Sequence, residues 1–168
     1  MNENLKKTLK AWPVITVLTI ALHYLTQLCA EWIGIKLPDQ ANLELVRKHI
    51  GWNMPFMLLC AQVLVIMPAA EEFVFRWLLF KLPTRVATRA SGRPGCLADE
   101  AAVVSSVLFS AAHYIMQPFP DAAFIALFFF GLAQCWLYKK TGSIWYPMLN
   151  HFLFNLTNII LLIALPQQ

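Results

Sequence analysis

The sequence predicts an all-α protein, a polytopic membrane bundle of about five transmembrane helices plus a short interfacial helix. Of its 168 residues, 59% are hydrophobic and only 13% are charged. A soluble domain of this size carries about 25% charged residues, so the composition favours an integral membrane protein. The length corresponds to one domain, and we expect residues 1–168 to form a single transmembrane domain.

The expected membrane helices are apolar runs long enough to cross a bilayer, which takes about 20 residues. Polar stretches rich in Lys, Arg, Gly and Pro separate these runs. The stretch 38–52 differs, because its apolar and charged residues fall on opposite helix faces, which is typical of a helix at the membrane interface. The predicted membrane helices are residues 12–35, 53–82, 98–116, 122–138 and 144–165, with a hydrophilic loop over 81–100.

Basic residues concentrate in three of the polar segments. The leader 1–10, the loop 81–100 and the Lys139–Lys140 turn hold nine of the thirteen Lys and Arg residues. Because cytoplasmic segments carry the excess of Lys and Arg, we expect a multi-pass protein of the cell membrane with a cytoplasmic N-terminus. The lipid bilayer is then a partner. Nucleic acid is not, since no basic stripe is present.

The second predicted helix contains two acids and an arginine within two turns. Each charge near the centre of a membrane helix costs roughly 2.5–3.5 kcal/mol, which favours a functional role. Glu72 and Arg76 stand four residues apart in the order that suits an ion pair, whereas Glu71 points about 100° away. We therefore expect Arg76 to hold Glu72 while Glu71 remains available as a general base. The alternative is a buried ion-pair cluster that only fixes helix packing.

Two later helices carry further polar pairs. Phe109 and His113 lie one turn apart in the third helix, and His151 and Asn155 share a face of the fifth. At 1.5 Å per residue, His113, His151 and Asn155 reach a membrane depth similar to that of Glu71. A lone histidine in a membrane helix is also explained by packing. The shared depth favours one common site.

The ordered motifs resemble a known family of membrane proteases. Glu71-Glu-x-x-x-Arg76, Phe109-x-x-x-His113 and His151-x-x-x-Asn155 are similar to the three motifs of the CAAX-processing and bacteriocin-processing (CPBP) family of intramembrane glutamic endopeptidases. The likeness covers about residues 68–155 and implies a protease core of about 53–165 behind a leading helix of about 12–35. Trp77 stands where a glycine often follows the motif arginine.

The resemblance implies hydrolysis of a peptide bond in a membrane-anchored protein or peptide. Glu71 and His113 would activate a water, and His151 and Asn155 would donate hydrogen bonds to the oxyanion, while Glu72, Arg76 and Phe109 would support the site. The substrate would be a C-terminal sorting signal, a leader peptide or a CAAX-type sequence. A bacterial member would lie in the inner membrane.

Two alternatives remain open on the sequence. No cofactor is expected; Glu71 and two histidines could bind zinc with a water as fourth ligand, but the chain has no His-Glu-x-x-His motif. A non-enzymatic membrane protein could use the same acids and histidines as a proton or ion relay, or as an immunity scaffold. Such a relay would conduct without cutting a substrate.

Overall fold

The computed structural model describes residues 2–37, 45–46, 48–51, 53–115 and 123–164. All regular structure in these ranges is helical, so the all-α prediction is confirmed. Most of the predicted interfacial helix 38–52 lies outside the described residues. The elements are α1 (Glu3–Trp32), α3 (Met54–Ala61), η1 (Gln62–Ile66), α4 (Met67–Glu72), η2 (Phe73–Lys81), α5 (Leu82–Ser91), α6 (Ala98–Ile115), α7 (Ala123–Thr141) and α8 (Trp145–Ala164).

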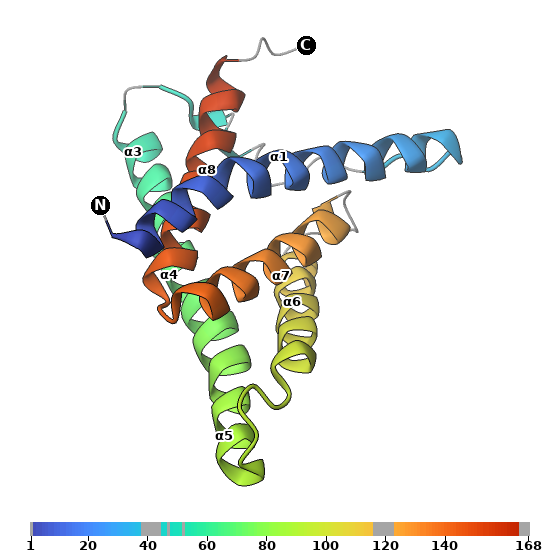
Figure 1. The fold of residues 1–168 in the computed structure, drawn as a ribbon. Coiled ribbons are helices and arrows are strands. Elements are labelled where there is room, and N and C mark those ends of the chain that lie inside the picture. The colour runs from blue at the N-terminus through green and yellow to red at the C-terminus, as the bar shows by residue number, and fades with distance from the viewer. Residues whose placement is uncertain (1, 38–44, 47, 52, 116–122, 165–168) are drawn as a thin grey trace.

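Three of the helices that the structure describes are long and apolar enough to cross a membrane. They are α1, the continuous helix 54–91 and α8. The shorter α6 and α7, of 18 and 19 residues, pack against each other and complete the bundle (Figure 1). The ends of α6, α7 and α8 agree with the predicted helices to within three residues. The apolar runs therefore locate the later helices correctly.

The helix 54–91 is the longest element and carries the paired acids. Its 38 residues span about 57 Å. It begins where the Asn53 side chain accepts a hydrogen bond from the Phe56 amide, and it ends at Gly92, whose φ of +67° suits a glycine helix cap. The prediction of a loop from residue 81 is therefore wrong. Arg85 and Arg89 continue the helix on an exposed face, so the change in polarity marks the end of the apolar run and not of the helix.

Two π-helical segments, η1 and η2, flank the short α4 that bears the acids. In η1, the Met67 amide donates to the Gln62 carbonyl, five residues earlier. The next bond of that pattern would run from residue 68 to the Val63 carbonyl, but Pro68 has no N–H to donate. The loosening predicted at Pro68 is thus present as π-helical geometry beside the acids, and π-bulges are frequent at functional sites.

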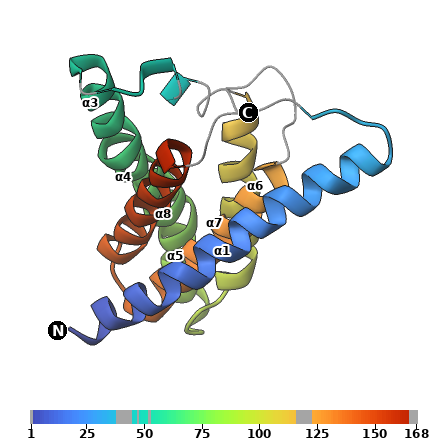
Figure 2. The same cartoon turned by 90° about the horizontal axis from the view of Figure 1, so that it is seen from above.

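Helix α1 differs from the predicted leading helix of about 12–35, because it begins at Glu3 and ends at Trp32. The basic leader is therefore helical, and the Asn2 side chain caps it by accepting from the Asn4 amide. Asn4 also donates to the Thr141 carbonyl at the end of α7. Figures 1 and 2 show α1 running across the bundle, where it packs on α7 and α8.

Contacts at the helix ends bring the basic segments together. The leader is joined to the α7–α8 turn by the Asn4–Thr141 bond. The start of α6 is joined to the end of α7 by an ion pair between Asp99 and Lys139 at 2.8 Å. These contacts agree with the prediction that the leader 1–10, the segment 81–100 and the Lys139–Lys140 turn lie on the same side of the membrane. That this end is cytoplasmic stays a prediction.

Aromatic side chains from several helices form the core next to the acids. Phe109 and Phe130 are 0% and 1% exposed, and they pack with Ile15 of α1 and Phe75 of η2. Next to Phe130 in the chain, α7 approaches α6 closely at Gly131, where an added Cβ would lie 2.9 Å from the Ser106 Cβ. Small residues at such crossings are typical of membrane helices. This packing fixes the helices that supply the site.

Candidate active site

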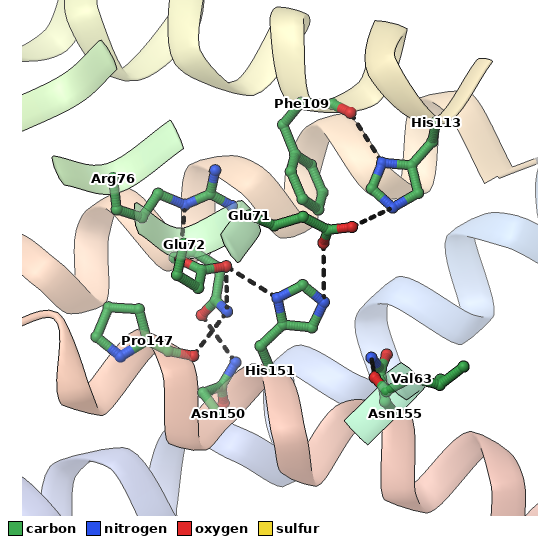
Figure 3. A network of polar contacts seen from close by, with 11 residues as sticks. Val63, Glu71, Glu72, Arg76, Phe109, His113, Pro147, Asn150, His151 and Asn155 are labelled. Carbon is green, nitrogen blue, oxygen red and sulfur yellow. Dashed lines mark hydrogen bonds and ion pairs between the residues drawn. The ribbon is translucent and has the colours of Figure 1, made fainter. Parts of the chain in front are cut away.

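The carboxylate of Glu71 lies between two imidazole rings from different helices. Its Oε1 is 3.8 Å from His113 Nε2 on α6, and its Oε2 is 3.7 Å from His151 Nε2 on α8 (Figure 3). The Glu71 side chain is 18% exposed, compared with 5% for His151. The structure therefore brings together three of the predicted site residues, and it leaves the acid loosely held.

The other ring nitrogen of each histidine is firmly engaged. His113 Nδ1 lies 2.9 Å from the Phe109 carbonyl, one turn earlier on α6, and His151 Nδ1 lies 2.9 Å from Glu72 Oε1. A carbonyl or an ionised carboxylate only accepts, so we assign the proton of each ring to Nδ1. In the neutral rings both Nε2 atoms then keep a lone pair, and both lone pairs face Glu71.

Glu72 is held far more tightly than its neighbour. Its Oε2 forms an ion pair with Arg76 Nε at 3.1 Å, and both side chains are 0% exposed. This is the pair that the four-residue spacing predicts. Its Oε1 accepts from His151 and, at 3.3 Å, from Gln134 Nε2 of α7. Glu72 therefore joins α4, η2, α7 and α8 through one carboxylate.

Phe109 packs against most of these groups. Its ring centroid lies 4.6 Å from that of His113 and 5.3 Å from that of Phe75. The Arg76 guanidinium carbon lies 4.6 Å from the same ring, a cation–π contact. Phe109 thus faces the buried cation and one imidazole at once. Its fully buried ring separates the Arg76 guanidinium from the His113 side chain (Figure 3).

Asn155 is placed differently from the other predicted site residues. Its Nδ2 donates to the Val63 carbonyl at 2.9 Å, so among the described residues its side-chain bond goes to η1 and not to the Glu71 cluster. Val63 supplies the carbonyl that Pro68 leaves without a π-helical donor. Asn155 therefore ties α8 to the helix that carries the acids, about two turns before them. Among the described residues, the second N–H of its amide has no acceptor.

The sequence reasoning missed two buried amides. Gln134 of α7 and Asn150 of α8 are both 0% exposed, and Asn150 Nδ2 donates to Gln134 Oε1 at 2.9 Å. Gln134 also donates to the Pro147 carbonyl at 3.0 Å. Gln134 could have been noticed, because it is a polar residue inside the apolar run 122–138, as Glu71 is inside the run 53–82. It became informative only once α7 was placed against α4.

The candidate metal ligands are Glu71, His113 and His151. Two tetrahedral zinc ligands with bonds of about 2.0–2.1 Å lie about 3.4 Å apart, whereas the carboxylate–imidazole distances here are 3.7 and 3.8 Å. Within the described ranges, no three His, Cys, Asp or Glu side chains are grouped to hold a metal ion.

Fold and site together define a class: a helical membrane protein whose apolar helices enclose an acid between two imidazoles. The model of the family described as "Type II CAAX prenyl endopeptidase Rce1-like" matches residues 51–157. The match covers more than half of the chain and includes all the predicted site residues. The chain therefore belongs to the Rce1-like family of membrane proteases, which is consistent with its CPBP resemblance. Neither the curated proteins nor the solved structures contain a match.

Proposed function

We propose that the protein is an intramembrane endopeptidase in which Glu71 and His113 activate a water to hydrolyse a peptide bond. The observation that carries the proposal is the position of the Glu71 carboxylate, 3.8 and 3.7 Å from two imidazole Nε2 atoms. These gaps are too long for direct hydrogen bonds but suit a bridging water. A water there would lie against a carboxylate oxygen and an imidazole lone pair, both of which accept protons.

The reaction transfers one proton and breaks one bond. Glu71 takes a proton from the water as the oxygen attacks the scissile carbonyl carbon, and His113 holds the water in line. The tetrahedral intermediate then expels the amine, which leaves with that proton. The products are a free carboxylic acid and a free amine, so atoms balance without a metal or redox partner.

His151 is suited to the oxyanion side of the reaction once its ring is protonated. In the neutral ring the proton sits on Nδ1, facing Glu72, and Nε2 cannot donate. The ionised Glu72 behind the ring stabilises the imidazolium form, in which Nε2–H donates a hydrogen bond to the oxyanion. The free N–H of Asn155 would supply a second donor. Such donors contribute about 3–4 kcal/mol each.

The substrate class follows from the family and the membrane setting. The family is named for CAAX prenyl endopeptidases. We propose a membrane-associated protein or peptide, with a C-terminal sorting signal, a leader peptide or a CAAX-type sequence as the candidates. Because the candidate site lies among apolar helices, we expect it to bind an extended segment of the substrate that lies in the bilayer or at its surface. We place the protein in the bacterial inner membrane with its N-terminus in the cytoplasm.

Co-expression with membrane-anchored precursors encoded by neighbouring genes tests the activity. The wild type should yield a shortened product whose mass identifies the cut site, and Glu71→Gln should yield only the intact precursor. Identical products from the two proteins would remove the proposed function. A relay would instead show proton flux in proteoliposomes without a product.

Metal independence is tested on the same purified protein in detergent. If Glu71 itself activates the water, cleavage should persist after dialysis against a strong chelator. A loss of cleavage with the chelator, restored by added zinc, would overturn the metal-free mechanism but leave the peptidase assignment in place.

A further inference from the structure

Gln134 lies near the middle of α7, and its amide is 0% exposed. It meets three groups from other elements: Glu72 Oε1 at 3.3 Å, the Pro147 carbonyl at 3.0 Å and Asn150 Nδ2 at 2.9 Å. An amide buried in an apolar membrane helix is costly unless its hydrogen bonds are made. Here both ends of the amide are engaged.

The three partners determine which way the amide points. The Pro147 carbonyl and the Glu72 carboxylate only accept, so they must face the NH₂ end of Gln134. Asn150 meets Gln134 Oε1, and it does so with its own donor, Nδ2. If the Gln134 amide were flipped, its oxygen would face the two acceptors, the Pro147 carbonyl and Glu72. Its NH₂ group would then face the NH₂ group of Asn150. The orientation is therefore fixed by chemistry.

This fixed donor acts on the carboxylate that orients His151. Glu72 Oε1 receives both Gln134 Nε2 and His151 Nδ1, while Oε2 faces Arg76. These contacts at both oxygens oppose rotation of the carboxylate away from the imidazole. The proton of the neutral His151 ring is thus kept on Nδ1, and its Nε2 is kept toward Glu71, 3.7 Å away.

We propose that Gln134, held by Asn150, is a positioning residue that fixes the orientation and tautomer of His151 through Glu72. The inference rests on the proposed peptidase function for its kinetic consequence. Its structural consequence, the tautomer of His151, can be measured without any substrate. The competing explanation is that Gln134 merely joins α7 to α8, as polar side chains do between membrane helices.

Gln134→Met tests the proposal, because methionine fills a similar volume without hydrogen bonds. The full chain in detergent micelles is labelled with ¹⁵N-histidine, and the His151 signals are identified by their loss in His151→Gln. In the wild type, His151 should show the Nδ1–H tautomer. In Gln134→Met, the Nε2–H tautomer should become populated, because Nδ1 no longer faces a fixed carboxylate. The kcat for peptide cleavage should fall about ten- to a hundredfold, because the His151 imidazolium loses the fixed Glu72 anion that stabilises it.

Ser106→Ala is the matched control. Ser106 is also buried between α6 and α7, and its hydroxyl bonds within its own helix to the Ala102 carbonyl. This variant should leave the His151 tautomer and kcat unchanged. If Gln134→Met behaves like Ser106→Ala in both readouts, Gln134 has no positioning role and the inference is overturned.

Asn150→Leu supplies a second variant in case Gln134→Met does not fold. It leaves Gln134 in place but removes the donor that fixes the amide, so it should change the tautomer and kcat in the same direction by a smaller factor. An unchanged tautomer in Asn150→Leu would contradict the inference. Failure of the peptidase proposal is recognised separately, because Glu71→Gln would then cleave as the wild type does, whereas the tautomer readout would be unaffected.

Discussion

Glu71 and Glu72 are adjacent residues on one helix, yet they occupy opposite kinds of environment. Glu72 is fully buried and has partners at 2.9, 3.1 and 3.3 Å. Glu71 is 18% exposed and lies 3.7–3.8 Å from its two imidazole neighbours. A helix turns about 100° per residue, so neighbours in sequence face different surroundings. One carboxylate therefore joins the helices, whereas the other lies beyond hydrogen-bond distance of both imidazoles.

The histidines connect the two environments. His151 donates from Nδ1 to the tightly held acid and presents Nε2 to the loosely held one (Figure 3). His113 does the same with a backbone carbonyl as its anchor. The hydrogen bond at Nδ1 of each ring thus fixes the position of its Nε2 relative to Glu71. Preorganised groups of this kind need little rearrangement during the reaction.

The largest effect should come from leaving Glu72 without its cation. Arg76→Leu leaves the buried Glu72 carboxylate without its cation, which should destabilise the protein by about 3–5 kcal/mol. The measurement is the unfolding midpoint in a denaturing-detergent titration. Arg85→Leu, which removes an equal charge from an exposed position on α5, is the control and should change stability by less than about 0.5 kcal/mol.

The double variant Glu72→Gln/Arg76→Leu sharpens the same comparison. It removes both charges, so it should recover part of the stability that Arg76→Leu loses. If Arg76→Leu were as stable as Arg85→Leu, the tight environment assigned to Glu72 would be wrong.

Crowding the α6–α7 crossing should have a smaller effect and should act on stability alone. An added Cβ at Gly131 would lie 2.9 Å from the Ser106 Cβ, so Gly131→Ala should destabilise the fold by about 1–3 kcal/mol. Ser106→Gly in the same chain should offset much of that loss. Because Glu71 lies outside this crossing, the folded fraction should retain the kcat of the wild type. A fall in kcat without a fall in stability would contradict this separation.

The smallest effect concerns the bond between Asn155 and the Val63 carbonyl. Asn155→Leu should lose about 1 kcal/mol of stability, because that carbonyl loses its donor. Pro68→Ala supplies a backbone N–H at the position that π-helical bonding would use. In the Pro68→Ala background, Asn155→Leu should therefore cost less. Equal losses in both backgrounds would show that Asn155 does not act through this carbonyl.

Residue spacing in the sequence predicts those parts of the site that depend on a single helix. The spacing of Glu72 and Arg76 gave their ion pair, and Pro68 gave a loosened helix beside the acids. The hydrophilic composition after Lys81 predicts a loop where the structure has a helix, because polarity indicates where an apolar run ends and not where a helix ends. Arg85 and Arg89 are good helix formers and continue the helix to Ser91.

Contacts between helices were beyond such patterns. Gln134 meets Glu72 from 62 residues away, and Asn155 meets Val63 from 92 residues away. Neither partner follows from a helical period, since both depend on how α7 and α8 pack on the acid-bearing helix. The tautomers of His113 and His151 likewise depend on the acceptors that face each Nδ1. These hydrogen-bond partners and tautomers could therefore be assigned only from the packing of the helices and not from residue spacing.

The most direct measurement compares Glu71→Gln with Glu72→Gln, side by side, for both peptide cleavage and unfolding midpoint. We predict that Glu71→Gln lowers kcat at least about a thousandfold and leaves the midpoint near that of the wild type. Glu72→Gln should lower the midpoint, because it leaves the buried Arg76 without its anion. Wild-type cleavage by Glu71→Gln, or an equal loss of stability in both variants, would contradict the division of roles between the two acids.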